Sequence, residues 1–222
     1  RDFTVNAIYL TPDGQLYDPV GGLADIIAKR VRFIGTPEAR IREDYLRILR
    51  FFRFSARYCS TFDPEGLAAC AALKDGVKQL SAERVGAEFF SILALPRALF
   101  ALAAMRESGV LTEIWDGEAD LEAAACMKEL EPSASAPLML AALYGDEGGG
   151  LGNRLRLSNA EKAMRSSALS GAEAIAPDMT DSNIRERMYR LGRDGFADAT
   201  LLAAARGVVT SREYQRLKTE AD

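Results

Sequence analysis

Histidine is absent from the 222-residue sequence. Its absence excludes Ser-His-Asp hydrolysis, histidine general bases and the usual histidine-containing zinc sites, so any acid–base or metal chemistry must use carboxylates. Cysteine is scarce too: Cys59, Cys70 and Cys126 are the only three, and none follows a CxxC spacing. We therefore expect a cytoplasmic protein whose thiols stay reduced.

Long apolar runs are also missing. No stretch near 18 residues is free of charged side chains, so we expect no membrane span and no membrane partner. A net charge of −4 excludes a generally basic nucleic-acid binder, but the charge is unevenly distributed. Residues 1–60 carry ten Lys/Arg and seven Asp/Glu, a net of +3, so a polyanion should engage this part of the chain.

A small β region is predicted only near the start of the chain. Phe3, Val5, Ala7 and Tyr9 alternate with more polar residues, which predicts a strand. A turn at residues 12–14 would return the chain through a second strand at 15–17, and residues 31–34 could form a third. The sequence opens at Arg1 without an initiator Met, so we expect a fragment whose N-terminal part is missing.

The rest of the chain is predicted to be helical, which gives a mainly α fold. Gly21 and Gly22 open a short helical stretch, and Thr36 is the expected N-cap of a long helix with Pro37 at its first position. Further helices are expected at 64–73, 81–95, 97–109, 121–130, 158–169, 181–191, 196–206 and 211–219, with linkers at 132–137 and 145–152.

The long helix predicted from Thr36 is rich in arginine. Six of them and no lysine fall between residues 40 and 57, together with the acidic pair Glu43-Asp44. At about 100° per residue all of these arginines except Arg42 share one side with the acidic pair, and the apolar residues gather on the other. Phe51 and Phe54 fall on the polar side, where they could stack on a base; we expect them instead to pack against the small β region. Guanidinium groups beside carboxylates and rings suit a nucleotide. The arginines are Arg40, Arg42, Arg47, Arg50, Arg53 and Arg57.

Asp44 and Arg47 lie three residues apart on the predicted helix, which would place an acceptor beside a donor. Such a pair complements the pairing edges of cytosine and adenine, whereas guanine and uracil would leave buried polar groups unsatisfied at a cost of roughly 1–3 kcal/mol each. An ordinary surface ion pair, worth under about 0.5 kcal/mol, is the alternative. Arg47, Arg50 and Arg53 could likewise follow a triphosphate, or form a solvated face with salt bridges to a neighbouring element.

Four blocks of sequence resemble a known family in order and approximate spacing. RDFTVNAI (1–8), DPVGGLADI (18–26), REDYLRILRFFRFSARY (42–58) and LSAERVGAEF (80–89) are similar to the class II tRNA nucleotidyltransferase/poly(A) polymerase family, which includes the CCA-adding enzymes; RLRLSNAEK (154–162) is a weaker match. The resemblance implies the C-terminal part of a nucleotidyltransferase head domain at 1–34, a helical neck at 35–95 that binds nucleotide and RNA, and a helical body and tail at 96–222 that bind tRNA.

The resemblance also implies an activity for the intact protein: CCA addition to tRNA 3′ ends from CTP and ATP with Mg²⁺. Alternatives are a poly(A) polymerase of the same family, acting on other RNA, and a non-catalytic helical RNA-binding module. The family binds its Mg²⁺ through a DxD carboxylate pair, which this sequence lacks and which we expect upstream of Arg1. No catalytic or metal-binding residue is therefore assigned, and the fragment alone is expected to be inactive.

Residue roles follow from the matched blocks. Asp44 and Arg47 are implied to read C or A as a protein template, with Arg50 and Arg53 near the nucleotide phosphates. Arg1, Asp2 and Asn6 are implied to contact the sugar and phosphates of the incoming nucleotide. Glu43, Glu83, Arg84 and Glu88 are implied to support the template helix, and Asp18, Gly21, Gly22 and Asp25 to link head and neck.

Overall fold

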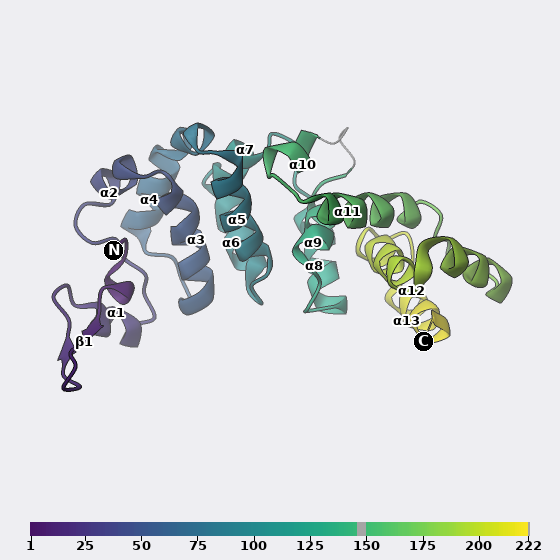
Figure 1. Cartoon of the computed structure of the whole chain (residues 1–222), viewed down its shortest axis with the longest axis horizontal. Helices are drawn as coiled ribbons and strands as arrows, with labels where there is room; N and C mark the ends of the chain where they lie inside the picture. Colours follow the sequence, from purple (N-terminus) through teal and green to yellow (C-terminus); the bar gives the residue numbers. More distant parts are fainter. Residues whose placement is uncertain (146–149, 222) are drawn as a thin grey trace. The chain divides into compact units, whose positions relative to one another are not determined.

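The computed structural model of the protein describes residues 1–145 and 150–221. The chain folds into two compact units, residues 1–116 and 117–222. Helices dominate both units, and the β structure of the described residues is limited to one two-stranded sheet and one isolated bridge (Figure 1). The predicted mainly α fold is thereby confirmed. None of the described helices combines the length and the apolar character that a membrane crossing requires.

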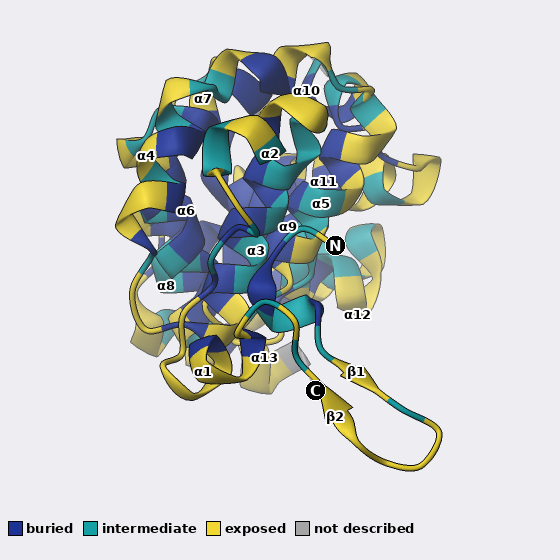
Figure 2. Ribbon diagram, turned by 90° about the vertical axis from the view of Figure 1, so that its left-hand side faces the viewer, coloured by how far each residue is buried: buried dark blue, intermediate teal, exposed yellow. Residues whose placement is uncertain are grey.

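The strand predicted to begin at Phe3 is wrong. A single 3-10 turn, η1 (Thr4–Asn6), occupies this segment, and Asn6 Oδ1 closes it by accepting the N–H of Phe3 at 3.2 Å. The expected third strand at 31–34 contributes only the bridge between Phe3 and Phe33. The remaining strands, β1 (Tyr9–Leu10) and β2 (Leu16–Tyr17), form an antiparallel hairpin whose four strand residues are exposed (Figure 2).

Helix α1 (Gly22–Ile27) begins where the two glycines predicted it. The carboxylate of Asp18 accepts the N–H groups of Gly22 and Leu23, each at 2.8 Å, so an anion satisfies free donors of the first turn. A Cβ on Gly22 would lie 2.2 Å from the carbonyl oxygen of Thr4, which shows how closely α1 packs on η1.

The single long helix predicted from Thr36 is also wrong. The structure has two helices, α2 (Pro37–Glu43) and α3 (Leu46–Tyr58), separated by Asp44 in an extended conformation (φ −160°, ψ 108°). The Asp44 carboxylate accepts the N–H of Leu46 at 3.1 Å, so this side chain starts the new helix. Thr36 precedes α2 as expected, but its side chain makes no capping hydrogen bond.

Helix α3 runs through the core of the first unit and packs against α5 (Ala82–Leu93) and α6 (Ala98–Glu107). Phe51, placed on the polar side by the helical projection, is fully buried and stacks on Phe33 with ring centroids 5.4 Å apart. Phe54 packs on Phe3 at 5.3 Å. The N-terminal segment covers this side of α3, so the expected packing role of both rings is confirmed. The other helices of this unit are α4 (Pro64–Ala72), η2 (Lys74–Gln79) and α7 (Val110–Ile114).

The second unit contains α8 (Leu121–Leu130), α9 (Ala136–Leu143), α10 (Gly150–Arg154), α11 (Asn159–Ala172), α12 (Asp181–Ala205) and α13 (Ser211–Ala221). Helix α9 was not predicted, and its start overlaps the linker expected at 132–137. The linker expected at 145–152 falls partly outside the described residues and overlaps α10 at its end. Gly192, with φ 73°, kinks α12 within the break predicted between two helices.

Candidate nucleotide-selection site

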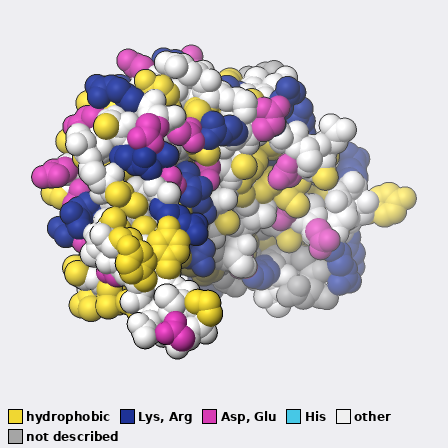
Figure 3. Space-filling model, turned by 60° about the vertical axis from the view of Figure 1, so that its left-hand side comes forward, with side chains coloured by type: hydrophobic (Ala, Val, Ile, Leu, Met, Phe, Trp, Pro, Cys, Tyr) yellow, Lys and Arg dark blue, Asp and Glu magenta, His cyan; other side chains and the backbone are white. Residues whose placement is uncertain are grey.

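Asp2 fixes two arginines of α3. Its Oδ1 accepts Nε of Arg47 at 3.0 Å, and its Oδ2 accepts Nε of Arg50 at 2.6 Å. The side chains of Asp2 and Arg47 are each only 15% exposed, so water competes weakly for these contacts. The N-terminal segment and α3 are thus joined by charge-assisted hydrogen bonds. Figure 3 shows Lys and Arg side chains interspersed with Asp and Glu on the N-terminal face that comes forward.

Glu43 holds the same group from the end of α2. Its Oε2 accepts Nη1 of Arg47 at 2.6 Å and also pairs with Arg40. Hydrogen bonds from Arg47 and then Arg40 lower the pKa of Glu43. Arg40 in turn donates Nη2 to the carbonyl oxygen of Arg1 at 2.6 Å, and Arg47 donates Nη1 to the carbonyl of Arg40 at 2.7 Å. The sequence placed Arg40 on the arginine face but gave it no role of its own, although its spacing of three residues from Glu43 indicated the pair.

Glu88, on α5, contacts Arg50 and Arg53 of α3. Its Oε2 lies 2.7 Å from Nε of Arg53, an ion-pair distance at which that N–H is not aimed at the oxygen; Nη2 of Arg53 donates to Oε1 at 3.4 Å instead. Nη1 of Arg50 lies 3.5 Å from Glu88 Oε1. The arginines therefore form salt bridges with neighbouring elements, as one of the two sequence interpretations had it. Phosphate binding by the same arginines stays a prediction.

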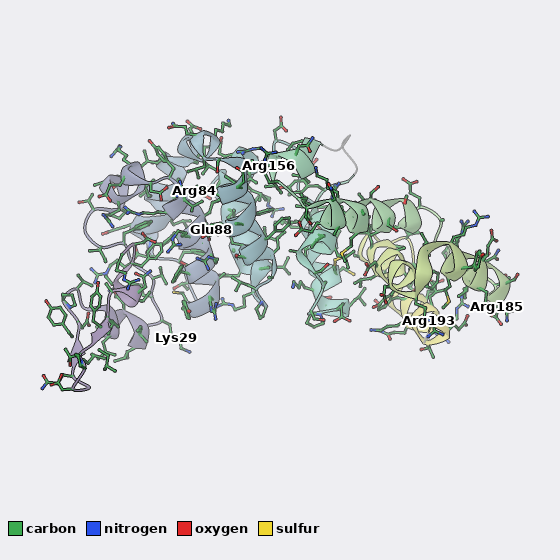
Figure 4. The ribbon with its side chains drawn as sticks, in the orientation of Figure 1. Lys29, Arg84, Glu88, Arg156, Arg185 and Arg193 are labelled. Carbon is green, nitrogen blue, oxygen red and sulfur yellow. The ribbon has the colours of Figure 1, made fainter. Side chains whose placement is uncertain are left out.

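Asp44 pairs with Arg84 and not with Arg47. Nη2 of Arg84, at the start of α5, lies 2.7 and 3.0 Å from the two carboxylate oxygens of Asp44. The premise that Asp44 and Arg47 share one helix face is therefore wrong, because the helix breaks at Asp44 and Arg47 turns to Asp2 and Glu43. Figure 4 shows Arg84 and Glu88 on the same helix.

The Asp44 carboxylate is held ionised at neutral pH. Burial alone would raise its pKa, but hydrogen bonds from Arg84 and from the N–H of Leu46 outweigh burial, and the pKa falls below its usual value. The side chain remains 33% exposed, and that of Arg84 is 47% exposed. An acceptor and an adjacent donor are thus both accessible to a ligand, and this is the arrangement that can read the edge of a base.

The residues predicted to link head and neck lie in α1 and directly before it. Asp25 is buried and accepts hydrogen bonds from Thr4, from Arg30 at 2.7 and 2.9 Å, and from Arg32 at 3.1 Å. Burial acts to raise the pKa of Asp25. The hydrogen bonds from these three partners lower it by more, so the pKa lies below its usual value. Asp25 therefore ties α1 to the segments on either side of it, while the linking role itself stays a prediction.

The remaining predicted residues lie on three different segments. Arg1 lies over the ring of Tyr9 at 5.8 Å, Glu83 is exposed in the first turn of α5, and Gly21 precedes α1 with φ 75°. Among residues 1–145 and 150–221, no group of three His, Cys, Asp or Glu side chains could hold a metal ion. The carboxylates described above are committed to arginines and helix starts, so they do not fit a Mg²⁺ site.

Two family models match the chain. Residues 1–32 match the poly A polymerase head domain, and residues 61–116 match the probable RNA and SrmB-binding site of polymerase A. The mitochondrial CCA tRNA nucleotidyltransferase 1 of Mus musculus is 36% identical over 170 residues, covering 73% of this chain and 39% of the mouse protein. The CCA-adding enzyme of Bacillus subtilis (strain 168) is 42% identical over 93 residues, covering 42% of this chain and 23% of that enzyme. The chain thus spans well under half the length of these relatives.

Solved structures share the fold. The Bacillus stearothermophilus CCA-adding enzyme in complex with CTP aligns with a TM-score of 0.76 at 23% identity, covering 99% of this chain and 57% of that one. The Thermotoga maritima CCA-adding enzyme complexed with tRNA aligns at 0.73 and 19% identity, covering 100% of this chain and 58% of that one. With the family models and the curated relatives, these matches show that the chain belongs to the class II tRNA nucleotidyltransferase/poly(A) polymerase family.

Proposed function

We propose that the whole protein is a tRNA nucleotidyltransferase that adds CCA to tRNA 3′ ends from CTP and ATP. In this proposal residues 1–34 belong to the head domain, 35–95 form the neck, and 96–222 form a body and tail that hold tRNA. The similarity to CCA-adding enzymes of mouse and Bacillus subtilis supports the activity. The free cysteines, of which Cys59 and Cys70 are buried, are consistent with a reducing cytoplasm.

The observation that carries the proposal is the ionised carboxylate of Asp44 at the break between α2 and α3. It accepts hydrogen bonds and has a guanidinium donor, Arg84, within 2.7 Å. Arg47 lies three residues after Asp44, and hydrogen bonds to Asp2 and Glu43 orient its side chain. A base with an amino donor beside a ring-nitrogen acceptor complements a carboxylate beside a guanidinium, and this edge is common to cytosine and adenine.

Arg50 and Arg53 follow along α3 and are the proposed phosphate contacts, with Arg1, Asp2 and Asn6 near the sugar. Glu43, Glu83, Arg84 and Glu88 are the proposed supports of α3, the template helix, and Glu43 and Glu88 pair with its arginines. Mg²⁺ would supply activation of the 3′-hydroxyl and of the leaving pyrophosphate. Since the described carboxylates do not fit such a site, the proposed role of this chain is restricted to binding and selecting the nucleotide.

The test uses the whole protein and a tRNA that lacks its CCA end. Asp44→Asn should raise incorporation of U and G relative to C and A by fivefold or more, because loss of one buried complementary contact costs roughly 1–3 kcal/mol. Arg50→Ala is the matched comparison, and it should weaken use of CTP and ATP alike. Unchanged base choice in Asp44→Asn would refute the template role. Incorporation of A alone by the wild type would indicate a poly(A) polymerase, and no incorporation a non-catalytic RNA-binding module.

A further inference from the structure

A cavity of about 460 Å³ opens in the first unit between α1 and the C-terminal end of α3. Val5, Ile26, Phe54 and Tyr58 give it apolar and aromatic walls. Its polar lining is Asn6, Lys29 and the paired Asp25 and Arg30. At 1.5 Å per residue, Tyr58 lies about 18 Å along α3 from Leu46, the first residue of α3 after the break at Asp44. The cavity is therefore distinct from the carboxylate of Asp44, but it adjoins the proposed nucleotide site, because Asn6 belongs to its lining and to the residues proposed near the sugar of the incoming nucleotide.

Its aromatic wall is open to solvent. The side chain of Tyr58 is 51% exposed, and its ring lies 5.9 Å from that of Phe54 at an angle of 47°. The guanidinium of Arg57 lies 5.5 Å from the centre of the Tyr58 ring. Exposed rings beside cations form stacking platforms for nucleobases, because every base presents a π-face.

Lys29 occupies a backbone position that favours glycine. Its φ is 50°, and it follows the end of α1, where Arg30 N–H bonds to the carbonyl of Asp25 at 2.9 Å and Lys29 N–H to that of Ile26 at 3.0 Å. This reversal is the Schellman arrangement, whose positive-φ position is usually glycine because a residue with a Cβ is strained there. A lysine kept at such a cost suggests a use for its side chain.

The Lys29 amine is available to a ligand. Among the residues that the structure describes, no carboxylate lies within ion-pair distance of it, whereas neighbouring Arg30 and Arg32 are both engaged by Asp25. Figure 4 shows Lys29 on the α1 side, below the end of α3. A cation and an exposed aromatic ring thus line one cavity.

We propose that this cavity binds one nucleotide unit of an RNA strand, with its base stacked on Tyr58 and an adjoining phosphate on Lys29. Val5 and Ile26 cover the edge of the base, and Arg57 adds positive charge at the rim. The choice of an RNA strand over a free nucleotide rests on the proposed function. The separation along α3 makes this unit a different one from a nucleotide whose base lies against Asp44.

The test measures binding of a fluorescein-labelled single-stranded hexaribonucleotide ending in CC to the 222-residue chain by fluorescence anisotropy. Lys29→Gly should raise the thermal midpoint, because glycine fits the positive φ, and yet weaken binding and reduce the salt slope by about 0.7, the value of one phosphate contact. Tyr58→Ala should weaken binding roughly 10- to 100-fold, while Tyr58→Phe should bind like the wild type. Arg106→Gln, an exposed cation outside the cavity, controls for net charge.

A purely structural Lys29 gives a different result. Lys29→Gly would then be more stable with unchanged affinity and salt slope, and this outcome overturns the proposal. So does a Tyr58→Ala variant that binds like wild type. CMP that competes with the oligonucleotide at similar affinity would overturn the choice of a strand and point to a mononucleotide. Asp44→Asn should bind the oligonucleotide like the wild type. The cavity proposal can therefore fail without affecting the proposed base selection at Asp44, which the incorporation assay tests separately.

Discussion

Replacing Arg84 by methionine removes the charge that faces Asp44 while preserving much of the side-chain length. The guanidinium contacts both carboxylate oxygens, at 2.7 and 3.0 Å, but the two side chains are 47% and 33% exposed. An ion pair this open to solvent contributes under about 1 kcal/mol. For a chain of this size we therefore expect the thermal midpoint to fall by no more than about 4 °C at neutral pH.

The pKa of Asp44 should respond more clearly than the stability. Burial pushes this pKa up, and the hydrogen bond from Arg84 is the largest influence that lowers it, so Arg84→Met should raise it. Because the folded-state pKa is depressed, the ionised carboxylate contributes stability above its unfolded-state pKa and loses it as pH falls through the folded-state pKa. The stability difference between wild type and variant should accordingly be largest at neutral pH and vanish in acid.

Carboxyl ¹³C NMR titration of Asp44, together with urea unfolding at neutral and acidic pH, measures both quantities. Arg106→Met serves as the control, since it removes an exposed arginine that has no contact with Asp44. The reasoning is refuted if Asp44 titrates at the same pH in wild type and Arg84→Met. A stability difference that persists undiminished in acid would equally contradict it, because a protonated Asp44 no longer pairs with a cation.

Two stability predictions test the packing around the site. Asp25→Asn should cost roughly 1–3 kcal/mol in urea unfolding, because an amide cannot accept all the bonds from Thr4 and the two arginines that converge on this buried group; a loss below 0.5 kcal/mol would show that those arginines simply turn to water. Gly76→Ala should cost about 1–3 kcal/mol, since its Cβ would lie 2.0 Å from the ring of Tyr45, whereas Gly145→Ala has open space and should be nearly neutral.

Helix starts were predictable where a local hydrogen bond defines them. Ser81 accepts the N–H of Arg84, and Ser158 and Glu161 form a capping box, so α5 and α11 begin where the sequence indicated. Helix α9 was missed because residues 137–143 are all buried, and a helix that is apolar on every side shows no 3.6-residue period. The resemblance of four short blocks identified the family, which the helical periodicity alone could not do.

The break at Asp44 shows why the site itself was only partly predictable. A continuous apolar period through residues 41–56 favoured one helix, yet an aspartate two residues before Leu46 was a usable N-cap signal. The partner that holds its carboxylate, Arg84, lies 40 residues away in sequence. Tyr45 is also fixed at a distance, by close packing on Gly76. These contacts depend on the tertiary fold, and the periodicity of the sequence cannot predict them.

The carboxylates around α3 orient its arginines but do not use all of their N–H donors. A guanidinium has five N–H donors, and Arg47 and Arg50 each contact Asp2 through Nε and a second carboxylate through Nη1. Their Nη2 groups take part in none of these contacts, so an anion can bind there without displacing the acid. Each carboxylate also removes side-chain freedom that a phosphate would otherwise have to restrict on binding. Asp2→Asn in the whole protein should therefore weaken CTP and ATP binding, whereas tighter binding would mean that Asp2 competes with phosphate.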